Sequence, residues 1–336
     1  FLAKVQEILV TTKLRILAEV KNDPMHQVLN QFLKIWGCGR AQALKWYTRG
    51  YRTIEEIAKA PDINLTTMQR LGLRYYDSIA NGVVSREQME ATLALINEVI
   101  QSLPAGEGFE AHLTGSYRRG KPSTHDVDIL VLTENPNVAE AMETLLQGLH
   151  SAGMLLEFLT TSAAGKNKYK AAEGLAHVKS CMVMAICKFP LGGQIGRADI
   201  KIYHKTAKPF ALLHCTGSAE FNRAMRWYGL SESEGMMQTI KTSTSAGRMR
   251  SWLTQKQKNT DEQKEAYRGV SPDLPNSLKL TDYELRPCFR ERRRNGKLTR
   301  NIIWEALPED CIRCDTEEDV FRAFGLSFVP PEMRKM

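Results

Sequence analysis

Three aspartates on two apolar segments are the residues of this chain best suited to chemistry. Asp126 and Asp128 alternate with apolar residues in the segment 125–131, and Asp199 does so in the segment 197–202. Residues two apart in a β-strand share a face, so each segment presents carboxylates on one side and apolar side chains on the other. If the two strands are neighbours in one sheet, three carboxylates converge. Their mutual repulsion then requires a cation between them.

An all-oxygen ligand set of this kind is suited to Mg²⁺, which keeps bound water and binds substrate phosphates. Two Mg²⁺ ions at Asp126, Asp128 and Asp199, for which Mn²⁺ can substitute, would support an in-line phosphoryl displacement. One ion would lower the pKa of an attacking hydroxyl and the other would neutralise a leaving pyrophosphate. Arg197 is placed to orient Asp199, the alternative being an arginine that faces solvent.

A basic turn bounded by glycines precedes the first pair of aspartates. Gly115, Ser116 and Arg119 lie in the sequence G-S-Y-R-R-G, whose side chains and backbone N–H groups form an anion cradle suited to a triphosphate. Arg86 gives an independent indication. It follows a capping box that begins at Ser85, and the helix dipole disfavours a cation there unless a phosphate binds nearby. The alternative is an exposed arginine.

A glycine-containing hairpin of two helices is predicted near the start of the chain. Residues 33–43 read as an apolar helix end, a Gly37-x-Gly39 turn and a second helix. Glycine permits a positive φ and a close approach of the backbone, and the second helix begins with free N–H groups. The pattern predicts a contact between Gly37, Gly39 and a DNA phosphate.

The remaining periodicity predicts helices first, then mixed helices and strands, then helices again. The helical pattern runs from the first residue to about Tyr76, and another helix follows the capping box. The expected strands are 111–114, 126–132, 182–187 and 198–203. A helix over 138–152 is expected between the second and third of them. Helices resume at Ser218. We interpret the polar residues 243–300, with their run of arginines at 290–294, as a solvated insertion; DNA contact is the alternative.

The composition excludes several classes of protein. The chain has 336 residues, 43% apolar and 25% charged residues and a net charge of +8, which excludes collagen, a coiled coil and wholesale disorder. No apolar stretch approaches the roughly 18 residues of a membrane span. The basic charge favours an anionic partner such as nucleic acid. Seven scattered cysteines favour a reducing compartment. Because the chain begins with Phe1, we expect it to be a fragment that lacks an amino-terminal region.

Taken together, these motifs resemble the family X DNA polymerases. The resemblance rests on G-S-Y-R-R-G-K, H-D-V-D, R-A-D-I and T-G-S-A-E-F-N-R, which occur in that order. It implies an α+β fold, with a nucleotidyltransferase palm built on a mixed five-stranded sheet, a helix-hairpin-helix subdomain and a mostly helical carboxy-terminal subdomain. The implied divisions are a remnant of a small lyase-type domain (1–20), the helix-hairpin-helix subdomain (21–94), the palm (95–212) and the subdomain that binds the nascent base pair (213–336).

The resemblance also implies roles for particular residues. Asp126, Asp128 and Asp199 correspond to the catalytic metal ligands. Backbone carbonyls of Leu33, Ile35 and Cys38 correspond to a Na⁺ or K⁺ site in the helix-hairpin-helix. The implied nucleotide-binding residues are Gly115, Ser116, Arg119, Arg86, His125, His214, Gly217 and Asn222. The implied DNA-binding residues are Gly37, Gly39, Arg197, Arg223 and Arg226. Asn222 and Arg226 are four apart and share a helix face, where they would meet the minor groove of the nascent pair.

The activity implied is template-directed filling of short gaps in end joining or base-excision repair, in which a dNTP is added to a primer 3′-OH. The partners would be gapped or broken double-stranded DNA, and end-joining factors through an amino-terminal domain absent here. A nuclear monomer without a membrane association is expected. Two alternatives stay open, namely template-independent terminal transfer and a catalytically impaired module that binds DNA ends. The short connection over 189–196 favours template dependence.

Some positions depart from the family pattern. His214-Cys215 stands where one branch has two aromatics and another has Gly-Trp, so we expect relaxed discrimination of the ribose 2′-OH; the alternative is that a backbone gate survives. His125 resembles the mu and terminal-transferase branch, the ending 328–332 resembles mu, and the mixture resembles a fungal-type polymerase IV. Lys4 stands at the lyase position but is interpreted as a surface lysine. Cys311-x-x-Cys314 lacks a second pair of zinc ligands.

Overall fold

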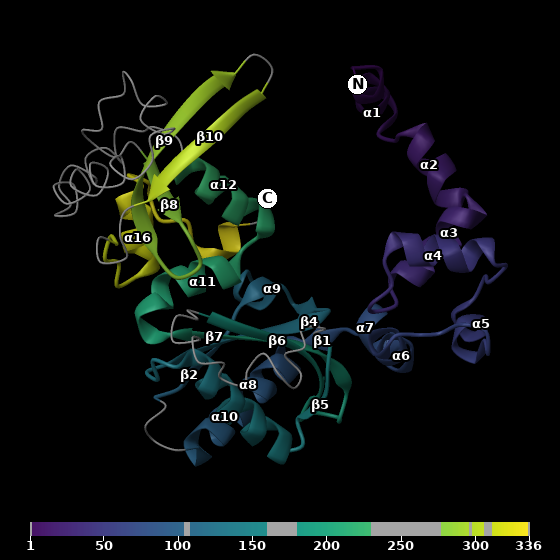
Figure 1. The fold of residues 1–336 in the computed structure, drawn as a ribbon, viewed down its shortest axis with the longest axis horizontal. Helices are drawn as coiled ribbons and strands as arrows, with labels where there is room; N and C mark the ends of the chain where they lie inside the picture. The colour runs from purple at the N-terminus through teal and green to yellow at the C-terminus, as the bar shows by residue number, and fades with distance from the viewer. Residues whose placement is uncertain are drawn as a thin grey trace, which may run out of the picture.

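A mixed five-stranded sheet forms the centre of the molecule (Figure 1). The computed structural model describes residues 2–103, 108–159, 180–229, 277–295, 298–305 and 311–334. The strand order is β2-β4-β7-β6-β5. Only β4 and β7 are parallel neighbours, and the other pairs are antiparallel. The strands are β2 (Glu110–Leu113), β4 (Asp126–Thr133), β5 (Leu155–Phe158), β6 (Ser180–Lys188) and β7 (Ile195–His204). This confirms the predicted α+β fold.

The two faces of β4 are buried against different helices. Val127, Ile129 and Val131 pack into a core that includes residues of α8 (Arg86–Ser102) and α10 (Val138–Ser151). Leu130 and Leu132 face the other way and pack with residues of α11 (Lys208–Thr216). Since Asp126 and Asp128 have the same parity as these leucines, their carboxylates lie on the α11 face of the sheet.

The amino-terminal helices lie to one side of the sheet (Figure 1). They are α1 (Leu2–Thr11), α2 (Arg15–Asn22), α3 (Pro24–Leu33), α4 (Arg40–Thr48), α5 (Ile54–Lys59), α6 (Thr67–Arg74) and α7 (Tyr76–Ala80). Gly37 takes a φ of +80° in the turn between α3 and α4, as the predicted hairpin requires. The capping box at Ser85 is also present at the start of α8. No helix in the described ranges combines the length and the apolar composition that crossing a bilayer requires.

Specific contacts dock the hairpin on the palm. The indole N–H of Trp36 donates to the carbonyl oxygen of Leu159, just after β5, at 2.7 Å. Arg74 at the end of α6 forms an ion pair of 3.6 Å with Glu157 in β5. The α3–α4 turn therefore has a defined position relative to the sheet.

The carboxy-terminal part lies to the other side of the sheet and contains strands as well as helices (Figure 1). A three-stranded antiparallel sheet, in the order β10-β9-β8, accompanies α11, α12 (Ala219–Gly229) and α16 (Glu317–Ala323). Its strands are β8 (Ser277–Leu280), β9 (Leu285–Asn295) and β10 (Leu298–Glu305). The short elements β1 (Val84–Ser85), α9 (Gly115–Arg118), β3 (Ser123–Thr124), η3 (Lys205–Ala207) and η5 (Pro331–Met333) complete the described chain.

The prediction that residues 243–300 form a solvated insertion is wrong for the second half of that range. Leu278, Leu280 and Leu285 are buried and pack with Phe321 and Phe324 in the carboxy-terminal core. Strand β8 and the start of β9 therefore belong to the subdomain itself. The polar composition concealed the strand, because only alternate positions of a sheet with one buried face need to be apolar. Residues 243–276 lie outside the described residues.

The packing of α6 against the hairpin predicts that Gly72→Ala destabilises the amino-terminal subdomain. A Cβ at Gly72 would lie 2.5 Å from the carbonyl oxygen and 2.6 Å from the nitrogen of Trp36, and this backbone cannot yield easily. We expect urea unfolding to show a loss of about 1–3 kcal/mol. Gly39→Ala is the matched control, because a Cβ there meets no atom within 4 Å, and its effect should stay below about 1 kcal/mol. Equal effects of the two variants would contradict the packing argument.

Candidate active site

The register of β4 against β7 brings the three aspartates together. Asp128 is the direct partner of Asp199, and Asp126 is the partner of Arg197. Neighbouring strands lie about 4.8 Å apart, and residues in register share a face. The structure therefore assembles the predicted carboxylate cluster where the first half of β4 pairs with β7.

Arg197 lies on this cluster. Its guanidinium forms an ion pair with Asp126, and its Nε lies 3.2 Å from Oδ1 of Asp199. The side chain is turned onto the carboxylates, in the orienting position that the sequence also predicted, and its contact with DNA stays a prediction. The ring of Trp36 lies 5.7 Å from the guanidinium, within the range of a cation–π contact.

Burial dominates the electrostatics of the cluster. It raises the pKa of Asp128 and of Asp199, because removing a carboxylate from water disfavours its charged form. The charge of Asp199 raises the pKa of Asp128 further, while Lys201 and Arg119 oppose the shift. Arg197 and Lys201 oppose it at Asp199. The charged cluster therefore depends on nearby cations.

The donor set fits divalent cations. As they stand, no three acidic, histidine or cysteine side chains of the described residues enclose a metal position, and Arg197 lies on the carboxylates. Oδ1 of Asp199 is buried without a hydrogen-bond partner, since the nearby N–H of Arg197 is not aimed at it. Three carboxylates at adjacent register positions supply the hard oxygen ligands that Mg²⁺ prefers.

Gly115 leaves the space in which the Asp128 carboxylate lies. The amide of Thr114 donates to the carbonyl oxygen of Asp128 at 2.9 Å, which brings the two segments into contact. Gly115 follows with a φ of +57°, and a Cβ at this position would overlap the Asp128 side chain. The predicted turn is the single-turn helix α9, and its first residue must be glycine for two independent reasons.

The cradle residues surround α9. Arg86 donates to the carbonyl oxygens of Tyr117 (3.0 Å) and Lys121 (3.1 Å) and stacks 3.8 Å above the Tyr117 ring. The carbonyl oxygen of Ser116, one residue into α9, accepts from the Lys121 amide. Arg119 donates to the carbonyl oxygen of Thr216 at the end of α11. The predicted triphosphate residues are therefore gathered between α8 and α11.

A second group of predicted residues lies across α11 and α12. The Asn222 side-chain amide donates to the carbonyl oxygen of His214 at 2.8 Å, and Arg226 lies 3.3 Å from Nδ1 of His214. Burial is the main cause that lowers the pKa of His214, which favours the neutral imidazole. A Cβ at Gly217 would lie 3.3 Å from Nη1 of Arg119 and 3.9 Å from Nδ2 of Asn222. Gly217 thus lies between Arg119 of the cradle and Asn222 of the His214 group.

The hairpin residues also occupy their expected places. Leu33 ends α3, Ile35 and Cys38 are buried, and Gly39 caps the start of α4. The carbonyl oxygen of Ile35 accepts the Cys38 amide at 2.9 Å, which leaves its second lone pair for a cation. Three further residues that the sequence singled out are exposed or have partners outside these groups. His125 is exposed and bonds the Gly82 carbonyl at 2.9 Å, Arg223 pairs with Glu220, and Lys4 is exposed on α1.

Three family models match the chain in the order of its subdomains. The fingers domain of DNA polymerase lambda matches residues 30–80, the DNA polymerase beta palm matches 84–205 and the DNA polymerase beta thumb matches 276–335. The palm match contains the carboxylate cluster, and the thumb match contains the strands first taken for an insertion. The chain belongs to the family X DNA polymerases.

Relatives from several branches of family X DNA polymerases are similar to this chain. DNA nucleotidylexotransferase from Xenopus laevis is 31% identical over 254 residues, covering 69% of this chain and 49% of the relative. DNA polymerase lambda from Arabidopsis thaliana is 31% identical over 234 residues, covering 69% of this chain and 41% of the relative. Human DNA-directed DNA/RNA polymerase mu is 25% identical over 348 residues, covering 98% of this chain and 57% of the relative. The chain thus spans about half the length of these relatives.

In this family X polymerase, sequence reasoning missed four residues that connect the cradle to the carboxy-terminal subdomain. They are Arg118, Thr216, Glu317 and Arg334. Arg118 and Thr216 lie inside quoted motifs and could have been noticed there. Glu317 and Arg334 are far away in sequence, and their local spacing gives no signal.

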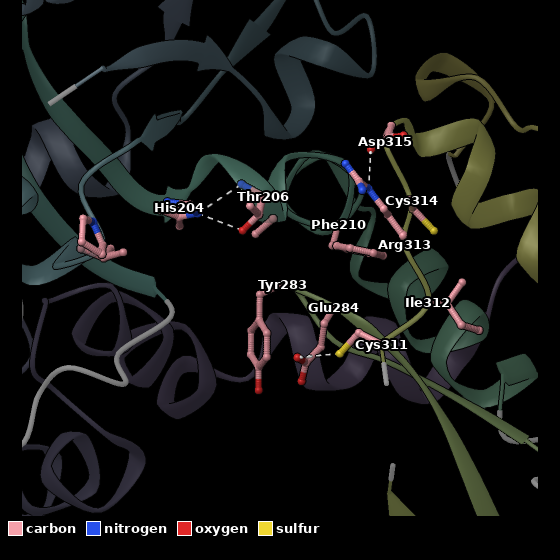
Figure 2. Close-up of a pocket in the computed structure, with 13 residues that line it drawn as sticks. His204, Thr206, Phe210, Tyr283, Glu284, Cys311, Ile312, Arg313, Cys314 and Asp315 are labelled. Atoms are coloured by element: carbon pink, nitrogen blue, oxygen red, sulfur yellow. Dashed lines mark hydrogen bonds and ion pairs between the residues drawn. The ribbon is translucent and has the colours of Figure 1, made fainter. Parts of the chain in front are cut away.

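A cavity of about 630 Å³ lies away from Asp126, Asp128 and Asp199, and Figure 2 shows the side chains that line it. Its lining includes His204, the last residue of β7, together with Phe210, Tyr283, Glu284 and Cys314. Cys314 is buried there, which raises the pKa of its thiol to about 12. Asp126 begins β4, whereas His204 pairs with the final residue of that strand. The cavity therefore lies at the other end of the sheet and is separate from the carboxylate cluster.

The site geometry predicts that Gly115→Ala disables the carboxylate site. The new methyl group would displace the Asp128 carboxylate, and a misplacement of about 1 Å can lower a rate about 100-fold. We expect single-turnover primer extension to slow by at least about that factor. Gly192→Ala is the matched control, because Gly192 also has a positive φ (+69°) but open space around its Cβ position. Similar rates for both variants would show that the methyl group does not disturb the site.

Proposed function

We propose that this chain is the catalytic core of a DNA-directed DNA polymerase that fills short gaps during DNA repair. It adds a dNTP to a primer 3′-OH and releases pyrophosphate. The observation that carries this proposal is the convergence of Asp126, Asp128 and Asp199 on one face of β4 and β7, beside the basic cradle of α9. Membership of family X supports it.

The three aspartates would hold two Mg²⁺ ions. When bound, these ions lower the pKa of the primer hydroxyl and neutralise charge on the triphosphate. Asp126 and Asp128 lie on β4, next to the cradle, whereas Asp199 lies on β7. We therefore assign Asp199 to the primer side and Asp126 and Asp128 to the nucleotide side. Arg197 balances the charge of Asp126 and Asp199 in the free enzyme and must release Asp126 when metal binds.

The protein groups around α9 would bind the nucleotide. Ser116 and Arg119 donate to the triphosphate, and Arg86 supports α9 through the carbonyl oxygens of Tyr117 and Lys121. His125, next to Asp126, is a further nucleotide contact in this proposal. Orientation of the triphosphate before reaction is the contribution of these residues, because positioning and electrostatics dominate phosphoryl transfer.

The His214 group would test the nascent base pair. Asn222 and Arg226 reach the minor groove from one face of α12, and that groove offers nearly the same acceptors for every correct pair. Arg223, exposed on the same helix, would contact the DNA backbone. Gly37 and Gly39 would approach a primer phosphate, assisted by a Na⁺ or K⁺ ion on the carbonyl oxygens of Leu33, Ile35 and Cys38.

Template dependence is supported by the short connection between β6 and β7. Six residues join these strands, and Phe189 bonds the carbonyl oxygen of Gln194 to close the turn. In this proposal, so short a turn favours the use of a template strand. Template-independent transfer is the second candidate, because a relative named DNA nucleotidylexotransferase is 31% identical to this chain.

The cellular setting belongs to the same proposal. We place the chain in the nucleus, as a monomer that acts on gapped or broken double-stranded DNA. End-joining factors would reach it through segments outside the present sequence. The nuclear location and the end-joining partners follow from the repair role that we infer. The basic net charge of +8 supports the binding of DNA.

Primer extension on three substrates tests the proposed function. A one-nucleotide gap and a recessed end should be extended according to the template, and single-stranded DNA should be extended poorly. Asp128→Asn should lower turnover by about 10³-fold or more while DNA affinity stays unchanged. Glu134→Gln is a matched control, an exposed carboxylate just beyond β4. Untemplated extension of single strands as fast as gap filling would favour terminal transfer, and full activity of Asp128→Asn would exclude the mechanism.

His214 predicts weak discrimination against ribonucleotides. Its imidazole is held by Asn222 and Arg226, whereas Cys215 beside it is buried in the core, so in this proposal His214 is the residue of the pair that meets the sugar. We expect the ratio of kcat/KM for dNTP over rNTP to stay below about 10³, or about 4 kcal/mol. His214→Tyr should raise this ratio by restoring an aromatic ring. A wild-type ratio above that limit would mean that the backbone alone excludes the 2′-hydroxyl.

A further inference from the structure

A fully buried arginine lies in the carboxy-terminal subdomain. Arg334 has 0% exposure, and its guanidinium lies 5.3–5.5 Å from the ring centres of Phe221, Phe321 and Phe328. Its Nε donates to the carbonyl oxygen of Val329 at 2.9 Å. A buried charge requires a counter-charge, since an isolated ion in an apolar environment is very unfavourable.

Glu317 supplies that counter-charge and shares it with the palm. Oε1 of Glu317 accepts from Arg334 at 2.8 Å, and the same carboxylate accepts two bonds from Arg118 of α9, at 3.1 and 2.5 Å. Glu317 is itself buried at the start of α16. This chain of three charges connects the carboxy-terminal core directly to the helix of the nucleotide cradle.

Arg118, the last residue of α9, and Arg119, which caps that helix, contact the same residue of α11 in different ways. Arg118 donates to the hydroxyl of Thr216 at 2.7 Å, and Arg119 donates to the Thr216 carbonyl oxygen. Arg118 is also fixed by the Glu317 carboxylate, whereas Arg119 donates to the neutral carbonyl oxygen of Thr216. A charge-assisted bond to phosphate is stronger than a bond to a neutral carbonyl, so Arg119 can exchange partners and Arg118 cannot.

We propose that the Arg118–Glu317–Arg334 chain positions the nucleotide cradle and thereby sets the affinity for dNTP. The proposal rests on the proposed polymerase function. Arg118 holds α9 and Thr216 at a fixed separation, while Arg119 moves from the Thr216 carbonyl to the triphosphate. Arg118 is thus a positioning residue that acts through Arg119, and Glu317 carries the coupling to the carboxy-terminal subdomain.

The test measures dNTP affinity without turnover. Wild type and variants are bound to gapped DNA with a dideoxy-terminated primer, and the Kd of the templated dNTP is measured by titration. Arg118→Met should weaken dNTP binding by about 5- to 30-fold, a usual size for coupling between sites. On an extendable primer, KM should rise similarly while kcat stays within a few-fold. A purely structural role would reduce the active fraction and leave Kd unchanged.

Two further variants make the result specific. Arg118→Lys keeps the charge but loses the forked bonds to Glu317, so its Kd should lie between those of wild type and Arg118→Met. Should Arg118→Met fail to fold in a thermal melt, Arg118→Lys decides the question alone. Glu318→Gln, an exposed neighbour of Glu317 on α16, is the matched control and should bind dNTP as wild type does.

The outcomes separate this inference from the polymerase assignment. If wild type extends primers but Arg118→Met and Arg118→Lys bind dNTP within twofold of wild type, the positioning role is wrong and the polymerase function stands. If Glu318→Gln weakens binding as much as the Arg118 variants, the effect is general and the inference also fails. If wild type neither extends primers nor binds dNTP, the proposed function itself fails.

Discussion

The repulsion between carboxylates on adjacent parallel strands is the constraint on which this structure depends. The register that pairs Asp128 with Asp199 fixes their proximity, and burial raises the pKa of both groups. The apolar faces of β4 and β7 enforce this register, because a shift by one residue would bury the aspartates in the core. The packing of the apolar core thus keeps the carboxylates of Asp128 and Asp199 close together despite their mutual repulsion. In the free protein Arg197 supplies compensating charge, and divalent ions do so in the active complex that we propose.

The other two parts of the chain act through a few contacts with this cluster. On one side, Trp36 docks the hairpin on the palm through the Leu159 carbonyl, and its ring lies within reach of Arg197. On the other side, Glu317 joins α16 to α9 through Arg118. The Arg118–Glu317 bonds are charge-assisted, the Trp36–Leu159 bond joins two neutral groups, and together they define where the neighbouring subdomains lie relative to the carboxylates.

The sequence predicted the palm well because its signals are local. The alternation around Asp126 and Asp199 defines both the strands and the face of the carboxylates, and the glycine at 115 is required by its positive φ. The three-stranded sheet was missed because the segment is rich in polar and charged residues. The Glu317–Arg118–Arg334 chain could not be foreseen, because ion pairs between residues 199 positions apart leave no periodic trace.

The most direct test of the carboxylate cluster is a crystal structure with gapped DNA, a dideoxy-terminated primer, the templated dNTP and Mn²⁺, with the ions located by their anomalous signal. The account predicts two anomalous peaks among Asp126, Asp128 and Asp199, with Asp199 on the primer side and Arg197 withdrawn from Asp126. Mn²⁺ bound elsewhere, or Arg197 still paired with Asp126 beside a bound dNTP, would contradict it.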